Sequence, residues 1–257
     1  MKNNSLLSAL FISLPILFAA CAKDGAVGPQ GTQGSTGPGG PILTGNLKGY
    51  VSLFDQYGSH VLVDQDSALV SLVGVTAQAY TDSAGKYAIA GLSTGVYTVN
   101  CSKSGYGANQ VNSLGFTGGG DLYRDIRISA IPSFHVDSIS LVADPNVVTI
   151  TGSIAMDTRV RTVLVFVGNG SNTSNDPAHY LGVYNRNVPA NQGNFMLTVP
   201  LTDLANLGIT SGQTAYFAAY GATANYNNAS SYEDLATGRT WFTAVSTAPA
   251  NRSVLIP

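Results

Sequence analysis

Apolar and polar residues alternate with a period of two from about residue 44 to residue 132, and this pattern predicts a series of short strands. Leu47, Gly49, Val51 and Leu53 form the first predicted inward face. Further inward groups are Ala68, Val70 and Leu72; Val75, Ala77 and Ala79; Tyr97, Val99 and Cys101; and Ile126, Ile128 and Ala130, with Arg127 and Ser129 outward. Turn residues at 81–85 and 91–95 separate the groups. The region is therefore predicted to be an antiparallel β-sandwich over 44–132.

A second alternating region covers 133–257. Its predicted inward groups are Ile139, Leu141 and Ala143; Val148, Ile150, Gly152 and Ile154; and Phe195, Leu197 and Val199. The run Val163–Val167 is apolar at every position, which predicts a central strand covered on both faces. Residues 202–207 predict one helical turn, and residues 254–257 predict a terminal strand. The predicted fold class is thus all-β, with two antiparallel β-sandwich domains in tandem.

The first twenty residues have the pattern of a secretory signal. Lys2 precedes the apolar run Leu6–Ala20, which is shorter than the roughly 20 apolar residues of a comfortable membrane-spanning helix. The order of apolar run, small residues and Cys21 resembles a bacterial lipobox, which implies that Cys21 is lipidated and becomes the new N-terminus. The alternative is ordinary cleavage beside an incidental cysteine. The lipobox predicts a protein anchored through lipid at Cys21 in the cell envelope, with the outer membrane as the expected location.

Glycine recurs at every third position from Gly25 to Gly40, within the segment 21–43. This spacing resembles a collagen Gly-X-Y tract, in which three chains wind together, but six triplets are few for a stable triple helix. The alternative is a single extended Pro/Gly spacer. In either case the segment is predicted to be a linker that is disordered unless three chains associate. It resembles the tracts that follow the lipidated cysteine in surface lipoproteins of the Bacteroidetes group.

Part of the first region resembles a known family. The residues that carry the resemblance are Thr81-Asp82-x-x-Gly85-Lys86-Tyr87, Gly91-Leu92, Gly95-Val96-Tyr97-Thr98-Val99 and Lys103-Ser104-Gly105-Tyr106. They are similar to the carboxypeptidase regulatory-like domain, which implies a seven-stranded, transthyretin-like sandwich with a carbohydrate-binding-like fold. The resemblance implies no peptidase chemistry, because no His-x-x-Glu pair occurs: His60, His135 and His179 are followed three positions on by Val63, Ser138 and Gly182.

The second region resembles another family more weakly. The run 212–220 is similar to the entry into strand F of fibronectin type III and immunoglobulin-like sandwiches. This resemblance implies that Tyr216 forms a tyrosine corner, with its hydroxyl bonded to upstream backbone.

Composition and charge exclude several functions. Charged residues make up 10% of the chain, against about 25% in a typical protein. The net charge of −2 argues against a nucleic-acid partner. With Glu233 as the single glutamate and with three histidines, the chain is not expected to be an enzyme or to need a cofactor.

Two groups of residues, the acidic loop residues and Cys101, each have an alternative interpretation. Asp64, Asp66 and the loop 172–176 could offer oxygen ligands to Ca²⁺, although such residues are more commonly solvated loop charges. Cys101 is expected in the core, the alternative being an exported redox or intermolecular thiol.

Candidate binding and modification residues come from two patterns. Tyr180, Tyr184, Tyr226 and Tyr232 fall near loops of the second region beside Asn and Asp, as in sugar-binding platforms, while Trp241 is expected in the core. The alternative is that tyrosine simply suits a pleated, half-buried surface. Ser67, Ser83 and Ser138 stand in Asp-Ser-apolar tripeptides that resemble Bacteroidetes O-glycosylation acceptors.

These observations predict a non-enzymatic, lipid-anchored envelope protein that presents β-sandwich modules for structural or adhesive interactions. The alternative is a carbohydrate-binding accessory lipoprotein of a polysaccharide-uptake system. The expected partner is correspondingly a surface protein or a glycan, and the oligomeric state stays open.

Overall fold

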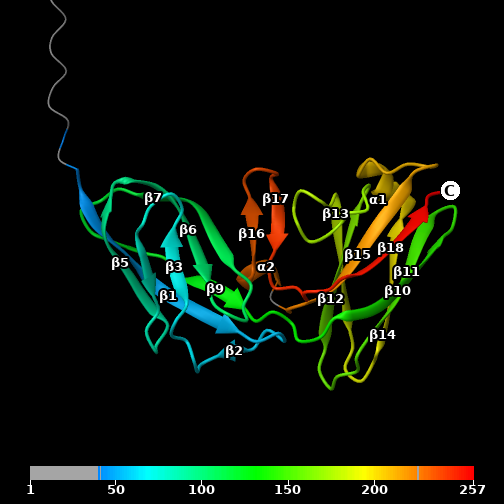
Figure 1. The fold of residues 1–257 in the computed structure, drawn as a ribbon, viewed down its shortest axis with the longest axis horizontal. Helices are drawn as coiled ribbons and strands as arrows, with labels where there is room; N and C mark the ends of the chain where they lie inside the picture. Colours follow the sequence, from blue (N-terminus) through cyan, green and yellow to red (C-terminus); the bar gives the residue numbers. More distant parts are fainter. Residues whose placement is uncertain (1–39, 41, 225) are drawn as a thin grey trace, which may run out of the picture. The chain divides into compact units, whose positions relative to one another are not determined.

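The computed structural model describes residues 40, 42–224 and 226–257, and residues 41–257 form one compact unit (Figure 1). The signal segment, Cys21 and the Gly-X-Y tract as far as residue 39 lie outside the described residues. Apart from two short helices, the described chain is built of strands, which confirms the predicted all-β fold class. Within the described ranges, no helix is long and apolar enough to span a membrane.

The first sandwich is formed by strands β1–β9. In one sheet, the long strand β1 (Thr44–Phe54) pairs antiparallel with β2 (His60–Val61) and β5 (Lys86–Ser93), and parallel with β8 (Asp121–Tyr123) and β9 (Ile126–Ser129). The facing sheet has the order β4 (Gln78–Tyr80), β3 (Leu69–Leu72), β6 (Gly95–Ser102) and β7 (Asn109–Phe116). The two parallel pairings are not predictable from alternation, which assigns faces but not neighbours.

The core of this sandwich follows the predicted parity. Leu47, Val51 and Leu53 of β1 are buried, and so are Val99 and Cys101 of β6. Burial raises the pKa of the Cys101 thiol to about 12, so the thiol behaves as a small apolar core group.

Local turn geometry changes two of the predicted elements. Val75 is exposed because Gly74, with a φ of +76°, turns the chain before β4 begins at Gln78. The segment 91–95, predicted to be a turn, is mostly strand, since β5 continues to Ser93 and β6 starts at Gly95. The turn at 81–85 is confirmed: Asp82 accepts backbone hydrogen bonds from Ala84 and Lys86.

The second sandwich is formed by strands β10–β18. One sheet has the order β10 (Val136–Ala143), β11 (Val147–Ile154) and β14 (Asn194–Pro200). The other has the order β13 (Gly182–Val188), β12 (Arg161–Gly168), β15 (Thr214–Ala222) and β18 (Ala250–Leu255). Helix α1 (Leu201–Asn206) is the predicted helical turn.

Every residue of β12 is buried, which confirms the predicted central strand. Val163, Val165 and Val167 face the core between the two sheets. On the opposite face, Leu164 and Phe166 belong to a separate cluster.

The chain between β15 and β18 covers that opposite face. It contains α2 (Tyr226–Ala229) and the hairpin of β16 (Ser231–Asp234) and β17 (Arg239–Phe242), drawn in orange to red in Figure 1. The ring of Phe166 lies 5.1 Å from that of Tyr180, 5.6 Å from that of Tyr220 and 5.6 Å from that of Phe242, centroid to centroid. The outer face of β12 and β15 thereby acquires an aromatic core of its own.

The residues around this hairpin also bind the first sandwich. The Ser129 amide donates to the Ser230 hydroxyl oxygen at 2.6 Å, and the Thr243 hydroxyl donates to the Ala108 carbonyl at 2.5 Å. Ser129 was predicted to point outward. It pairs with Phe54 on the face turned away from the core of the first sandwich, but it is fully buried there. The physical reason is tertiary, because the chain around Ser230, a hundred residues later, covers that face of β9.

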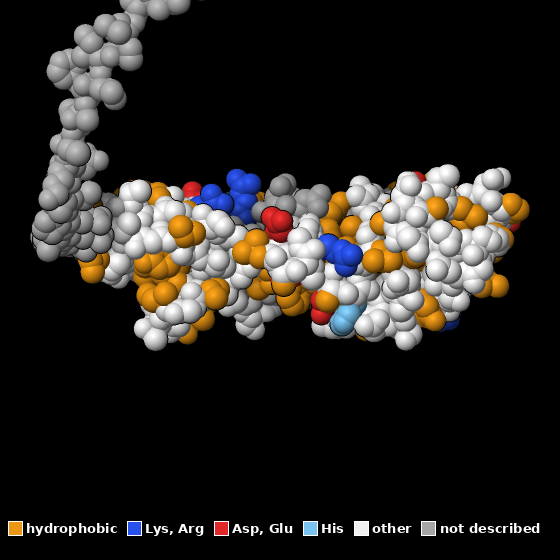
Figure 2. Space-filling view, turned by 90° about the horizontal axis from the view of Figure 1, so that it is seen from above, with side chains coloured by type: hydrophobic (Ala, Val, Ile, Leu, Met, Phe, Trp, Pro, Cys, Tyr) orange, Lys and Arg blue, Asp and Glu red, His pale blue; other side chains and the backbone are white. Residues whose placement is uncertain are grey.

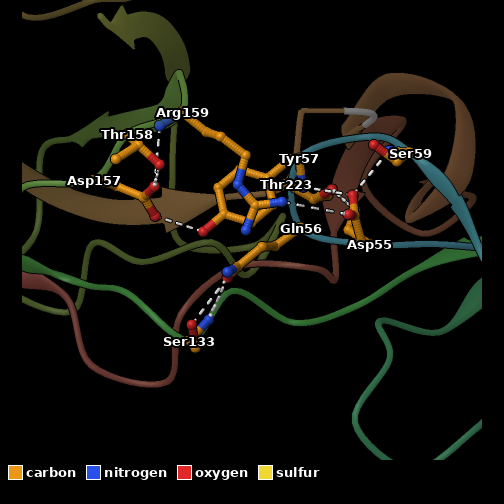
Figure 3. Close-up of polar contacts among 9 residues, drawn as sticks. All are labelled: Asp55, Gln56, Tyr57, Ser59, Ser133, Asp157, Thr158, Arg159 and Thr223. Atoms are coloured by element: carbon orange, nitrogen blue, oxygen red, sulfur yellow. Dashed lines mark hydrogen bonds and ion pairs between the residues drawn. The ribbon is translucent and has the colours of Figure 1, made fainter. Parts of the chain in front are cut away.

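A second set of contacts joins the sandwiches near the loop 55–59 (Figure 3). The Tyr57 hydroxyl donates to Asp157 Oδ2 at 2.5 Å, and this hydrogen bond holds the pKa of the Asp157 carboxyl below its ordinary value. The Arg159 guanidinium lies 3.2 Å from the centroid of the Tyr57 ring, in a cation–π arrangement. Gln56 Oε1 accepts the Ser133 amide at 2.7 Å. The two sandwiches are therefore joined by side chains as well as by the chain at residues 130–135. The division of the chain into separate domains at 44–132 and 133–257 stays a prediction.

Tyr216 does not form the implied tyrosine corner. In β15, its neighbours Ala215 and Phe217 face the core between the sheets, so Tyr216 points away from that core. Within the described part of the chain, its hydroxyl has no hydrogen-bond partner.

Candidate functional site

Three exposed tyrosines gather on the first sandwich. Tyr50 is 47% exposed, Tyr80 is 63% exposed and Tyr123 is 70% exposed. Together with Lys48, Asp82, Lys86 and Tyr87 they line an open depression of about 410 Å³. We call the residues Lys48, Tyr50, Tyr80, Lys86 and Tyr123 the tyrosine surface.

Strand register explains why these side chains meet. Tyr50 pairs with Lys86 across β1 and β5, and Lys48 pairs with Tyr123 across β1 and β8. Directly paired residues project from the same face of a sheet, so these four side chains share the outer face of β8, β1 and β5. Tyr80 comes from β4, the edge strand of the facing sheet.

A close backbone approach at Gly49 tightens this part of the sheet. A Cβ at Gly49 would lie 2.0 Å from the Arg124 carbonyl oxygen, so only glycine lets the chain around residue 124 approach β1. The buried Tyr87 hydroxyl donates to the same carbonyl at 2.6 Å. Desolvation raises the pKa of Tyr87, which keeps this phenol protonated as a donor. The tyrosine surface therefore lies over a closely packed, hydrogen-bonded layer.

The two lysines of the tyrosine surface differ in their partners. Lys48 Nζ is 2.7 Å from Asp121 Oδ2, and this pair raises the pKa of Lys48 and lowers that of Asp121. Lys86 Nζ lies 5.8 Å from the centroid of the Tyr50 ring, and among the described residues it has no carboxylate partner. The Lys86 ammonium can therefore donate hydrogen bonds to a ligand beside the rings.

This arrangement suits recognition of a polyhydroxylated ligand. Exposed aromatic rings present flat apolar faces on which the C–H face of a sugar can stack, and the ammonium groups supply hydrogen-bond donors beside them. Charged groups are present too, since Lys48, Lys86 and Asp82 line the depression. Charged residues are few in the chain as a whole, and on the face drawn in Figure 2 blue and red side chains are sparse among orange and white ones.

The four tyrosines singled out from the sequence lie elsewhere. Tyr180 is buried, with its hydroxyl donating to the Thr240 carbonyl at 2.5 Å, and Tyr226 packs its ring 5.9 Å from Phe242. Tyr184 packs against the core between the sheets. Tyr232 stacks 5.9 Å from Trp241, which is half-buried rather than fully in the core. The structure thus does not bring these four rings onto one exposed rim, and glycan contact by them stays a prediction.

Alternation contained part of the signal for the tyrosine surface. It places Tyr50 and Tyr80 on outward faces of their strands, whereas Tyr123 lies in a short strand between charged residues. The pattern does not reveal that β8 lies beside β1, so it could not predict that the three rings meet.

The three predicted glycosylation serines are all exposed. Ser83 lies in the turn 81–85, Ser67 adopts a φ of +61°, and the Ser138 hydroxyl is 2.9 Å from that of Ser153. Their modification stays a prediction.

The candidate calcium ligands are also not gathered. In the chain as described, no three His, Cys, Asp or Glu residues cluster in a way that could hold a metal ion. A calcium site at Asp64 and Asp66 or in the loop 172–176 stays untested.

Comparisons with known proteins give only distant likenesses. No protein-family model and no curated protein matches the chain. A cohesin–X-dockerin complex from Acetivibrio cellulolyticus is 25% identical over 30% of this chain and 51% of that one, with a TM-score of 0.27. A Bacteroides uniformis protein, whose carbohydrate binding is a provisional assignment, is 17% identical over 83% of this chain and 100% of its own, with a TM-score of 0.30. A DUF3823 family protein from Bacteroides ovatus is 15% identical over 84% of this chain and 100% of its own, with a TM-score of 0.31.

This chain therefore spans about half the length of the cohesin–dockerin match and the whole length of the two Bacteroides matches. At TM-scores this low, the likenesses carry no argument about ligand or activity.

Proposed function

We propose that this protein is a non-enzymatic, lipid-anchored envelope protein that binds carbohydrate through the tyrosine surface. The observation that carries the proposal is the meeting of three exposed tyrosine rings around a depression that also holds Lys48 and Lys86. Such a protein would serve as a glycan-binding accessory to a polysaccharide-uptake system.

The physical case rests on preorganisation. Two of the rings stand on strands paired through β1, so little conformational freedom is lost when a sugar stacks on them. The depression is open and shallow, which favours a chain of sugars lying across it over a small ligand enclosed within it.

Removing one ring is expected to weaken glycan binding three- to tenfold, because an aromatic contact contributes about 1 kcal/mol. The full-length protein in detergent is first screened on a glycan array, and the best-binding oligosaccharide is then titrated by calorimetry against Tyr50→Ala and Tyr123→Ala. Tyr123→Phe should retain binding, because stacking needs the ring and not the hydroxyl.

Tyr232→Ala is the matched control, since Tyr232 is a sequence-derived candidate outside the tyrosine surface. If Tyr232→Ala weakens binding while Tyr50→Ala and Tyr123→Ala do not, the site lies in the second sandwich and the proposal is wrong.

Anchoring has its own test. Cys21→Ser is expected to release the protein from the membrane fraction and to abolish fatty-acid labelling, because the acyl chains supply the membrane affinity. Cys101→Ala should keep both the membrane association and the label, because Cys101 lies in the core of the first sandwich. Membrane-bound, labelled Cys21→Ser protein would exclude the lipid anchor.

A structural or adhesive role is the second candidate, and the contacts between the sandwiches favour it. Two separate sets of hydrogen bonds, around Tyr57 and around Ser230, hold the sandwiches together, as a load-transmitting or spacing element requires. Consistent absence of binding on the glycan array would favour this role.

A further inference from the structure

The outer face of the three-stranded sheet β10–β11–β14 carries two cross-strand rows of side chains that are polar except for Met196. Ser138 pairs with Ser153, which pairs with Asn194, and Ser140 pairs with Thr151, which pairs with Met196. These residues line a groove of about 530 Å³, walled on one side by Arg186, Asn187, Pro189 and Gln192. We call this feature the polar groove.

The charge in the polar groove is one-sided. Of the side chains that the structure describes, Arg186 is the only ionised one that lines the groove, and none of the lining residues is Asp or Glu. Among the described residues, the Arg186 guanidinium has neither an ion-pair nor a hydrogen-bond partner. A planar guanidinium presents five donors in a geometry that matches a carboxylate, so the groove has an unfilled position for one anionic group.

The rest of the lining matches a sugar ring better than a peptide side chain. Ser140, Thr151 and Asn194 offer hydroxyl and amide groups that donate and accept, as the hydroxyls of a saccharide require. Met196, which is 58% exposed, provides an apolar contact within the same row. An uncharged floor that mixes hydroxyl and amide groups with apolar surface, with one guanidinium at its wall, is complementary to a sugar that carries hydroxyls, C–H faces and a carboxylate.

We propose that the polar groove is a second binding site, which takes a saccharide bearing a carboxylate, with Arg186 holding the carboxylate. The site lies in the second sandwich and shares no residue with the tyrosine surface, so it does not depend on the function proposed above. Two sites of different chemistry in one compact unit would let a mixed acidic and neutral polysaccharide bind at both, with a gain in avidity.

The test uses trigalacturonate and its methyl ester, which differ in charge but not in hydroxyl pattern. With the full-length protein in detergent, trigalacturonate is expected to bind at least tenfold more tightly than the ester at low salt. Arg186→Gln should lower the affinity for the acid about tenfold and leave that for the ester unchanged. Met196→Ala should weaken both ligands equally, because it removes an uncharged contact.

Arg252→Gln is the matched control, since Arg252 is an exposed arginine of the same sandwich outside the polar groove. Equal affinity of the acid for the protein and for Arg186→Gln overturns the proposal. Binding of a hexaglutamate peptide as tight as that of trigalacturonate overturns the saccharide specificity. If Tyr123→Ala loses trigalacturonate binding and Arg186→Gln retains it, the acidic sugar binds at the tyrosine surface. That outcome refutes the second site and leaves the function proposed above in place.

Discussion

Phe166→Ala is expected to lower the free energy of unfolding by about 3–5 kcal/mol. Phe166 is fully buried at the centre of the cluster on the outer face of β12 and β15, where its ring contacts Tyr180, Tyr220 and Phe242. Truncation leaves a cavity among these rings, and a shift of Tyr180 into it would break the hydrogen bond between Tyr180 and the Thr240 carbonyl. Because Phe242 belongs to β17, the hairpin is expected to loosen first.

Chemical denaturation of the full-length protein measures this loss. Phe166→Leu, which retains most of the volume, should cost less than about 1.5 kcal/mol. Val96→Ala, at a site 73% exposed, should change stability by no more than about 0.5 kcal/mol. A cost for Phe166→Ala as small as that for Val96→Ala would mean that the aromatic cluster does not stabilise the fold.

Gly107→Ala is expected to disrupt the contact between the first sandwich and the segment 229–244. The free energy of unfolding should fall by about 1–3 kcal/mol. Gly107 is buried, and a Cβ there would lie 2.5 Å from the Ala244 amide nitrogen and 2.7 Å from the Thr243 carbonyl carbon. Both neighbours are backbone atoms, so no flexible side chain can yield. Relief requires the two sandwiches to separate at this point.

Amide hydrogen exchange provides the measurement. In Gly107→Ala, the amides of Ser129 and Thr243, which are hydrogen-bonded to Ser230, should exchange faster, while amides in the core strand β12 should not. Gly115→Ala is the control, because Gly115 lies in β7 with open space around its Cβ position. If the two variants exchange alike, the packing at Gly107 does not join the sandwiches.

The candidate sites show how far sequence patterns reach. Ser140 and Thr151, like Tyr50, lie at outward strand positions, so their exposure follows from alternation alone. Their grouping does not, because the tyrosine surface needs β8 beside β1, and the polar groove needs β14 beside β11. Strand neighbours are chosen by pairing and packing over long sequence separations, which a local period of two does not encode.

The sequence by itself determined which side of each strand faces a core. The buried odd positions of β1 and the fully buried β12 follow from apolar residues leaving water. Only the tertiary structure decided what lies against the faces turned away from the cores. Ser129 is buried because the chain around Ser230 covers it, whereas Tyr123 is exposed because nothing in the described chain covers it. The burial of a side chain on such a face therefore depends on distant chain segments and not on its neighbours in sequence.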